Sequence, residues 1–391
     1  MESFDVTIIG AGVVGCAVAR EASRLSLKIA VLEKELDVAC GNSSRNTGML
    51  HAGFTYAPGS LKAACAVEGN QEFDQVAQEL DVPFKRTGKL VVGFDEKDRE
   101  NILKFKKIGE INGVRGMEMI DRKRMDEIDP NAGGNFAMYV PSSGILDPMQ
   151  YTIALAENAC ANGVCFRFGH KVERISRLED GWMLHTSKGD VKTKWVINCA
   201  GMYASQISAM LGYPEYPVRG FKGEYYVLDK KAGKNMPIPI YPAPNEKGGF
   251  ATHATPTIDG NVLVGPDSYL TEGLEDYKVT KEHMDGLYTD GLKMFKEMKR
   301  EYFIRNFAGI RWKIYDPATG ENKDFVLESD GANPFTVNLV GIESPGLTCA
   351  LPLARRAVSI LKEKENPAPN PAFNPCRRGI RRFSEMTREE Q

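Results

Sequence analysis

The chain has 391 residues, of which 42% are hydrophobic and 26% charged, and its formal net charge is −2. This composition is typical of a folded globular protein, and the length favours two domains over one. The balanced charge argues against nucleic-acid binding, and no apolar run is long enough to predict a transmembrane segment. The start of the chain lacks the basic and apolar regions of a secretory signal. We therefore expect a cytoplasmic protein, either free or peripheral to the membrane.

Eight cysteines are present, and none of them forms a C-x-x-C pair. Several lie in apolar runs such as "VINCAG" and "LTCALP", where a thiol behaves as a small buried hydrophobic group. We therefore expect reduced cysteines and no metal site.

Residues 5–35 predict a strand, a glycine turn, a helix and a second strand. The apolar run at 6–9 is short and β-branched, as is typical of a strand buried in a parallel sheet. The turn has the pattern G-x-G-x-x-G and consists of Gly10, Ala11, Gly12, Val13, Val14 and Gly15. Glu33 ends the second strand and is followed by Lys34. This order of elements is the context in which the pattern binds a dinucleotide.

Each part of this unit has a physical role in that interpretation. Gly10 permits the tight turn, and Gly12 lets the backbone approach a pyrophosphate. Gly15 lets the helix pack closely, with its N-terminus directed at the phosphates. Glu33 accepts hydrogen bonds from the ribose hydroxyls. These residues predict a bound dinucleotide, which on this pattern alone is either a nicotinamide or a flavin nucleotide.

Further elements follow in chain order. We expect a strand at 88–94, charged surface helices at 96–112 and 118–128, a helix at 149–164, and strand-like runs at 165–176, 181–186 and 192–198. Residues 217–265 predict β-structure with loops, and residues 275–300 predict a charged helix. A strand, a turn at Pro345–Leu347 and a helix end the core, before a proline-rich stretch and a basic tail. The free N–H groups at the start of that last helix favour an electron-rich flavin ring as their partner.

Six segments carry a family resemblance. They read "IIGAGVVG", "RNTGMLHAGFTYAPGSLKA", "LDVPFKRTGKLVV", "THATPTIDGNVLVGP", "IRNFAGIR" and "GIESPGLT". They extend over residues 5–350, and through them the chain resembles the FAD-dependent D-amino-acid oxidase superfamily, which has the glutathione-reductase-type FAD fold. Within that superfamily the chain is similar to type 2 glycerol-3-phosphate oxidases and dehydrogenases and to L-2-hydroxyglutarate oxidase.

The resemblance implies an α/β fold, in which a Rossmann-like FAD-binding domain of non-contiguous segments is joined to a β-rich α+β substrate domain. We expect the FAD-binding domain at 1–85, 145–212 and 325–366, the substrate domain at 86–144 and 213–324, and a C-terminal tail at 367–391. The family also implies non-covalent FAD. Matching the family motifs, the implied cofactor-binding residues are Gly10, Gly12, Val13, Val14, Gly15, Glu33, Lys34, Ser43, Ser44, Thr47, Val172, Ala200, Gly201, Gly346, Leu347 and Thr348.

The same resemblance implies that His51 lies on the substrate side of the flavin as the catalytic base. Oxidising a secondary alcohol removes a proton from oxygen, and imidazole accepts a proton near neutral pH. We therefore expect the rate to rise with pH through a single ionisation near neutrality. His253 is expected to position the substrate, and Arg311 to bind its acidic group through a planar guanidinium.

Arg219 and Lys222 are expected to supply further positive charge to the substrate. Here the chain departs from the "RGEYY" pattern of similar enzymes, because Phe221, Lys222 and Gly223 are interposed. Arg219 and Lys222 therefore either bind the substrate or lie on the protein surface.

The expected reaction is oxidation of the secondary alcohol of a small anionic substrate by hydride transfer to FAD, with sn-glycerol 3-phosphate giving dihydroxyacetone phosphate. The first alternative is L-2-hydroxyglutarate, or another L-2-hydroxy acid, giving the 2-oxo acid. Further alternatives are a non-catalytic FAD subunit for electron transfer and an NAD-dependent dehydrogenase. The electron acceptor is expected to be dioxygen or a redox partner protein. In longer relatives a segment like "RRFSEMTREE" leads into an iron–sulfur domain, and the sequence leaves open whether that module is absent or the chain is shortened.

Overall fold

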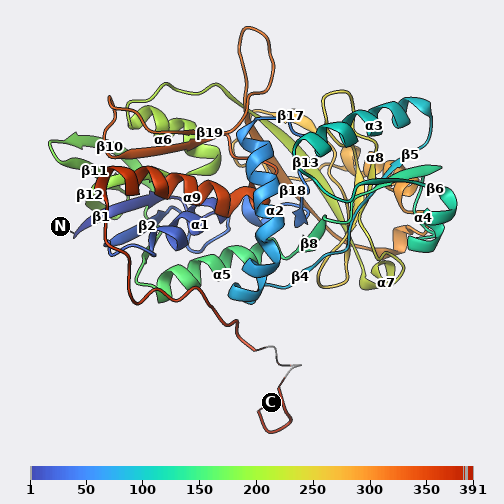
Figure 1. The fold of residues 1–391 in the computed structure, drawn as a ribbon, viewed down its shortest axis with the longest axis horizontal. Coiled ribbons are helices and arrows are strands. Elements are labelled where there is room, and N and C mark those ends of the chain that lie inside the picture. The colour runs from blue at the N-terminus through green and yellow to red at the C-terminus, as the bar shows by residue number, and fades with distance from the viewer. Residues whose placement is uncertain (1, 382, 384–385, 391) are drawn as a thin grey trace.

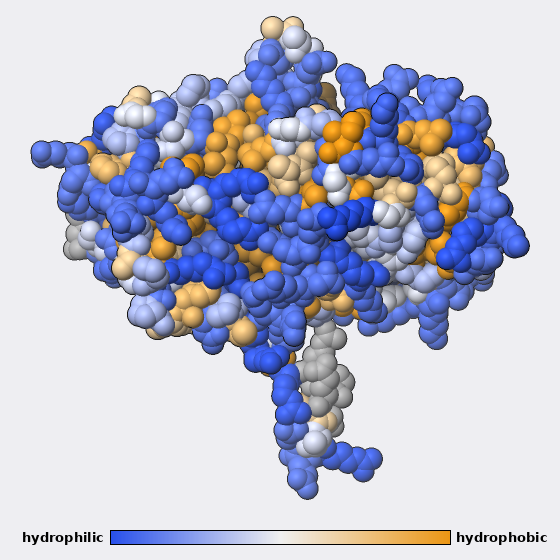
Figure 2. All heavy atoms as spheres, viewed as in Figure 1, coloured by the Kyte–Doolittle hydropathy of each residue, from blue (hydrophilic) through white to orange (hydrophobic). Residues whose placement is uncertain are grey.

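The computed structural model describes residues 2–381, 383 and 386–390. Two lobes lie side by side, as Figure 1 shows, and each is built on its own sheet. Counting strands within the described residues, the first lobe has an eight-stranded sheet and the second lobe a nine-stranded sheet. On the face shown in Figure 2, apolar side chains form separate groups among polar ones. Among the described residues, no helix is long and apolar enough to cross a membrane.

The first lobe has a mostly parallel central sheet. Its strands are β1 (Glu2–Ile9), β2 (Ile29–Glu33), β9 (Cys165–Phe168), β10 (Val172–Leu178), β11 (Gly181–Thr186), β12 (Gly189–Asn198), β19 (Val326–Glu328) and β20 (Thr336–Val340). β1 lies parallel to β2 and β12, and β9 and β20 extend this parallel core. The predicted strand–turn–helix–strand unit at 5–35 is confirmed.

Helices cover both faces of this sheet. They are α1 (Val13–Ala22), α2 (Leu61–Leu80), α5 (Pro148–Ala161), α6 (Ala204–Met210) and α9 (Gly346–Glu365). Alternate residues of β2 enter two different cores, as the period of a strand requires. Val31 packs with α1, α2, α5 and α9, whereas Leu32 packs with Ile207 of α6. The sheet is therefore buried on both faces, which explains the continuous apolar run in the sequence.

The second lobe is mainly antiparallel. Its strands are β5 (Leu90–Gly93), β6 (Glu118–Asp121), β7 (Phe136–Tyr139), β13 (Val218–Leu228), β14 (Ile240–Pro242), β15 (His253–Pro256), β16 (Val262–Gly265), β17 (Tyr269–Thr271) and β18 (Phe303–Ile314). Its helices are α3 (Glu96–Ile111), α4 (Arg122–Ile128), α7 (Lys230–Gly233) and α8 (Lys281–Met294). A small sheet of β3 (Met49–Leu50), β4 (Phe84–Lys85) and β8 (Gly144–Leu146) completes the fold. The predicted α/β class is confirmed, while the residue boundaries of the two domains stay a prediction.

Three predicted elements differ in the structure. The run at 165–176 is divided into β9 and β10 at Gly169, whose φ of +70° ends the extended conformation. The helix predicted at 118–128 is wrong in its first turn: those residues form β6 against β7, and Asp121 then caps α4 by accepting the N–H of Arg124. α8 begins at Lys281, because residues 275–280 are held by contacts to other parts of the molecule described below.

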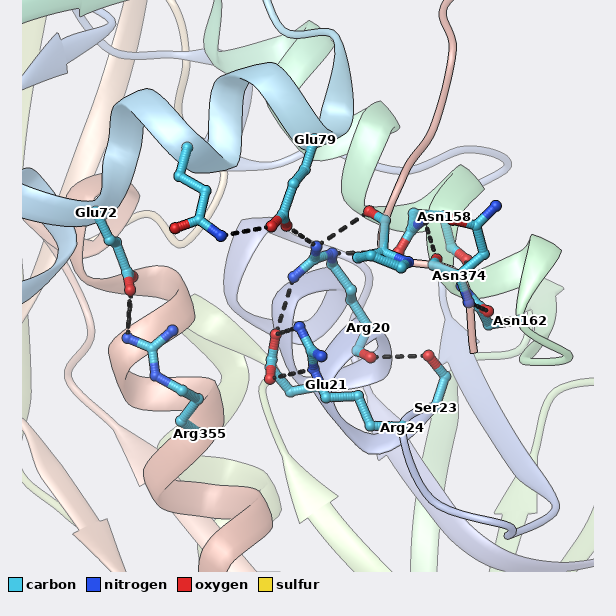
Figure 3. A network of polar contacts seen from close by, with 12 residues as sticks. Arg20, Glu21, Ser23, Arg24, Glu72, Glu79, Asn158, Asn162, Arg355 and Asn374 are labelled. Carbon is cyan, nitrogen blue, oxygen red and sulfur yellow. Dashed lines mark hydrogen bonds and ion pairs between the residues drawn. The ribbon is translucent and has the colours of Figure 1, made fainter. Parts of the chain in front are cut away.

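A buried arginine joins the helices of the first lobe. Arg20 of α1 has a side chain that is 2% exposed, and Figure 3 shows it among carboxylates and amides. It contacts Glu21 at 3.0 Å, Glu79 of α2 at 2.7 Å and the amide oxygen of Asn158 of α5 at 3.1 Å. It also donates to the carbonyl of Pro375 at 3.2 Å. The chain after α9 is therefore attached to the first lobe through the same guanidinium.

We expect Arg20→Ala to lower the free energy of unfolding by about 3–5 kcal/mol, because it removes a buried guanidinium that contacts Glu21, Glu79 and Asn158 at once. The measurement is urea unfolding followed by circular dichroism. Arg24→Ala is the matched control, since Arg24 pairs with the same Glu21 at 2.8 Å but is 42% exposed. That variant should lose no more than about 1 kcal/mol. Equal losses in the two variants would contradict the role given to the buried guanidinium.

Candidate functional site

Close backbone contacts shape the glycine turn between β1 and α1. Gly10 has a φ of +104°, and a Cβ there would lie 2.5 Å from the carbonyl oxygen of Cys199. At Gly15 a Cβ would lie 1.9 Å from the carbonyl oxygen of Gly10, so a side chain would force α1 away from the turn. α1 begins after Gly12, which has no side chain that could cap the helix. N–H groups at its N-terminus are therefore available to an anion.

The segment after Gly41 crosses the start of α1. The N–H of Val13 donates to the hydroxyl of Ser43 over 2.9 Å, while Ser44 donates to a carbonyl within its own turn. The side chain of Asn42 accepts the N–H of Ile310 in β18 at 2.9 Å. This segment therefore joins the glycine turn to the second lobe.

Glu33 lies at the end of β2, where its carboxylate faces the glycine turn. It accepts the N–H of Ala11 at 2.7 Å and the N–H of Glu35 at 2.9 Å. The carboxylate is thereby held at the carboxyl end of the parallel sheet, which is where open α/β sheets bind nucleotides.

A segment of the second lobe covers this end of the sheet. Lys34 pairs with Glu275 at 2.7 Å, and Glu275 also accepts the hydroxyl proton of Tyr203 at 2.8 Å. The ring of Tyr277 lies 4.2 Å from the guanidinium carbon of Arg45. Residues 275–277 thus contact the first lobe at three places. Lys34 is engaged by this segment, and its contact with the cofactor stays a prediction.

Three other predicted cofactor residues lie where strands of the first lobe begin or end. Val172 begins β10 and is 8% exposed. Ala200 and Gly201 follow β12, and Gly201 adopts a φ of +58° as the chain turns into the short helix η2 (Gly201–Tyr203). Their positions at the rim of the sheet agree with the expected adenine and phosphate contacts, which stay predictions.

The start of α9 brings the C-terminal part of the chain to the loop of His51. α9 begins at Gly346, and Pro345 before it provides no side-chain cap. The hydroxyl of Thr348 accepts the backbone N–H of His51 at 3.0 Å. Leu347 packs against the apolar core of the first lobe. A free helix N-terminus therefore lies beside the loop that is predicted to face the substrate.

These residues fit FAD. The glycine turn has no space for a Cβ at Gly10 or Gly15, and the N-cap residues of α1 and α9, Gly12 and Pro345, provide no side-chain cap. A pyrophosphate at α1 and an electron-rich ring at α9 would each meet the partial positive charge of a helix end. The carboxylate of Glu33 is an acceptor suited to ribose hydroxyls.

The predicted substrate residues converge from different strands. His51 follows β3, His253 begins β15, and Arg311 lies on β18. The ring of His253 stacks on Tyr241 with centroids 3.7 Å apart. Arg311 donates to the carbonyl of Asp267 at 3.3 Å. His51 and Arg311 are both near enough to act electrostatically on His253, while the contact of these three residues with a substrate stays a prediction.

The two histidines are poor proton acceptors in the free site. Loss of hydration, and then the positive charge of Lys89, lower the pKa of His51 to about 3. The same two causes, followed by His51 and Arg311, lower the pKa of His253 well below its usual range. Both imidazoles are therefore neutral at neutral pH. The expected ionisation of His51 near neutrality does not hold for the free site, because burial disfavours its charged form.

Arg219 and Lys222 are not brought to the histidines. Lys222 is opposite Ile310 in the β13–β18 pair, whereas Arg311 is opposite Phe221, so Lys222 and Arg311 lie on opposite faces of the sheet. The ammonium of Lys222 pairs with Asp276 at 2.9 Å. Arg219 donates to residues of the 316–324 loop, including the carbonyl of Gly320 at 2.6 Å. A substrate role for Arg219 and Lys222 stays a prediction, and the contacts given above do not favour it.

Sequence reasoning missed Lys89 and the aromatic residues around it. Lys89 is 0% exposed and lies immediately before β5. One signal in the sequence could have found it, namely a lysine followed directly by the apolar strand "LVVGF". No comparable signal exists for Tyr225 and Tyr241, which lie beside Thr47 and shape the same site.

Comparison with known proteins identifies the family. The family profile described as FAD-dependent oxidoreductase (DAO) matches residues 5–360. The chain belongs to this family. Glycerol 3-phosphate dehydrogenase of Caloramator mitchellensis is 37% identical over 397 residues, which covers 99% of this chain and 80% of that relative. The mitochondrial L-2-hydroxyglutarate dehydrogenase of Caenorhabditis elegans is 29% identical, and the match covers 92% of this chain and 93% of that protein.

A solved structure shares the fold over nearly the whole chain. It is the dithionite-reduced L-alpha-glycerophosphate oxidase of Mycoplasma pneumoniae with FAD bound, with a TM-score of 0.89 and 27% identity. The match covers 96% of this chain and 99% of that one. As a member of the DAO family the protein is an FAD-dependent oxidoreductase, and the relatives named here act on CH–OH donors.

We expect Glu33→Ala to raise the dissociation constant of FAD by about 10- to 100-fold, because a hydrogen bond to a charged group contributes about 1.5–3 kcal/mol. Titration of the apoprotein with FAD, followed by fluorescence, measures this constant. Glu35→Ala removes a neighbouring carboxylate and should change the constant by less than about threefold. Acid precipitation of the wild-type protein should release the yellow colour, since we expect the cofactor to be non-covalent. Unchanged affinity in Glu33→Ala would remove Glu33 from the cofactor site.

Proposed function

We propose that the protein oxidises the secondary alcohol of sn-glycerol 3-phosphate to dihydroxyacetone phosphate. The observation that carries the proposal is the grouping of His51, His253 and Arg311 beside the start of α9. The charged groups that act on the two histidines include Lys89 and Arg311, which are both positive. A guanidinium beside neutral imidazoles favours an anion and offers a proton acceptor next to it. Similarity to a glycerol 3-phosphate dehydrogenase over 99% of this chain supports a phosphate ester as that anion.

Each side chain has a separate task in this proposal. Arg311 binds the phosphate, and its contact with the carbonyl of Asp267 restricts the direction of the guanidinium. His253, stacked on Tyr241, orients the substrate. His51 accepts the proton of the hydroxyl group that is oxidised. When bound, FAD supplies the acceptor for the hydride that leaves the carbinol carbon.

Substrate binding and base strength are coupled at His51. Because its pKa in the free site is about 3, His51 carries no extra proton at neutral pH, so it does not have to lose one before catalysis. A bound phosphate is an opposite charge for the imidazolium form and therefore raises the pKa of His51. The histidine thus becomes a stronger base when the substrate arrives. The acid limb of the rate is expected below neutrality, because the ring is protonated only at low pH.

A second candidate substrate is L-2-hydroxyglutarate or another L-2-hydroxy acid. A carboxylate fits the same guanidinium, and the 29% identity to an L-2-hydroxyglutarate dehydrogenase over 92% of this chain favours it. In both cases the proposed electron acceptor is dioxygen or a redox partner protein. A subunit that only transfers electrons would have no use for the histidine and arginine grouping.

Anaerobic mixing of the holoprotein with each substrate tests the proposal. We expect sn-glycerol 3-phosphate to bleach the flavin absorbance, because Arg311 and His51 then meet a phosphate and a hydroxyl. L-2-hydroxyglutarate should bleach it at least about tenfold more slowly at equal concentration, since a different anion has to occupy the same contacts. Bleaching by L-2-hydroxyglutarate alone would select the second candidate. Failure of both substrates would favour the electron-transfer subunit.

We expect His51→Asn to lower the rate of anaerobic flavin reduction by about 10²–10⁴-fold, the usual contribution of general acid–base catalysis. FAD content should not change, because the side chain faces the substrate. Arg311→Ala should instead raise the substrate concentration needed for half-maximal reduction, since it removes a charge-assisted contact. Arg219→Ala is its matched control, because Arg219 is engaged by an exposed loop on the same strand pair. A wild-type rate of flavin reduction in His51→Asn would show that this histidine is not the base.

A further inference from the structure

Lys89 is a buried positive charge without a conventional partner. It is 0% exposed, and within the described residues its ammonium has no hydrogen-bond acceptor. Three aromatic rings surround it instead, with the centres of Phe54, Tyr241 and Phe250 at 4.7, 4.5 and 5.0 Å from the nitrogen. The backbone N–H and the carbonyl of Lys89 both pair with Val140, so the residue cannot turn outward.

Such a lysine is unfavourable for stability alone. Buried charges are normally paired, and an unpaired one is retained at functional sites. The faces of aromatic rings offset part of the lost hydration by cation–π attraction. Burial nevertheless lowers the pKa of Lys89 to about 7. The side chain is therefore mostly charged below neutrality, and an anion nearby would keep it charged at higher pH.

Lys89 lies close to both histidines of the site, because Phe54, whose ring faces its ammonium, follows His51 by three residues. Tyr241 contacts the ammonium and also stacks on His253, so one ring separates Lys89 from His253. Lys89, next to β5, acts on both histidines, and Arg311, on β18, acts on His253. His51 itself also acts on His253.

We infer that Lys89 is a positioning residue that keeps His51 free of a proton while an anionic substrate occupies the site. The inference rests on the proposed function, because it requires an anion beside His51. That anion raises the pKa of His51, which makes it a stronger base but also lets it take a proton from water as the pH falls, and a protonated His51 cannot accept the hydroxyl proton. The ammonium behind the aromatic wall opposes this effect without touching the substrate. The proton can then pass from the substrate oxygen to a ring nitrogen of His51, leaving the O–H electron pair on oxygen.

Lys89→Met tests the inference, because it removes the charge and keeps the length of the side chain. In the wild-type protein, the limiting rate of anaerobic flavin reduction should fall at low pH as His51 becomes protonated. In Lys89→Met this acid limb should move to higher pH by about one unit, the size of effect that one nearby charge has at a partly buried site. The two proteins should reach similar rates at high pH. A packing defect would instead lower the rate at every pH.

Three further variants separate charge from packing. Lys89→Arg should keep the wild-type acid limb, and Lys89→Gln should repeat the effect of Lys89→Met if methionine disturbs folding. Lys106→Met is the control, because Lys106 of α3 lies in the same lobe but pairs with Glu110 within its own helix. It should leave the acid limb where it is. Thermal unfolding should show Lys89→Met to be at least as stable as the wild-type protein.

An equilibrium measurement keeps the inference independent of the substrate. The chain has five histidines, so ring-labelled protein allows each to be followed by NMR, with His51→Asn assigning one signal. With inorganic phosphate as the probe, the protonation midpoint of His51 should lie about one unit higher in Lys89→Met than in the wild-type protein. The same difference is expected without phosphate. Equal midpoints in the two proteins would overturn the inference. If the His51 midpoint shifts but neither substrate reduces the flavin, only the proposed substrate is overturned.

Discussion

The close approach of α1 to the end of the parallel sheet is the constraint on which the rest of the structure depends. It exists because Gly15 lies directly against the backbone of Gly10, and Gly10 against Cys199 after β12. With no side chain in these places, the N-terminus of α1 opens onto the carboxyl end of the sheet. Ser43 and Glu33 then contact the same turn from two sides. A cofactor held there by backbone N–H groups needs no positively charged side chain for its phosphates.

That arrangement leaves positive side chains available to the proposed substrate. His51 is attached to α9 through Thr348, while His253 and Arg311 come from the second lobe. The site is therefore assembled only when the two lobes meet. Its low hydration strengthens every electrostatic interaction inside it, so a single buried lysine influences both histidines. Chemistry that transfers a proton and a hydride benefits from such a dry site, because water does not screen the charges involved.

The lobes are joined by more than the substrate site. The segment at 275–277 contacts Lys34, Tyr203 and Arg45, and Asn42 contacts β18. These contacts surround the end of the sheet where the cofactor is proposed to lie. Arg20 of α1 donates to the carbonyl of Pro375 in the tail. The helix that begins at the glycine turn is thus also held by a segment distant in sequence.

Local sequence determined the first unit of the fold and the class of the protein. The strand–turn–helix–strand unit around Gly10, Gly12, Gly15 and Glu33 could be predicted, because its pattern is contained in residues 5–35, although the contact of Gly10 with Cys199 could not. The first turn of the helix predicted at 118–128 could not, since Glu118–Asp121 pair with β7, the next strand along the chain, and this pairing overrode the local preference. Propensity is a weak guide wherever tertiary pairing competes with it.

The tertiary structure decided which charged residues face the site. Arg311 and Lys222 lie on neighbouring strands and have similar chemistry, but the register of β13 against β18 places them on opposite faces. Lys89 became part of the site only because Phe54, Tyr241 and Phe250, from three separate segments, enclose it. A sequence shows that a residue is cationic; which anion or base it acts on depends on strand register and on burial, and both are properties of the folded chain.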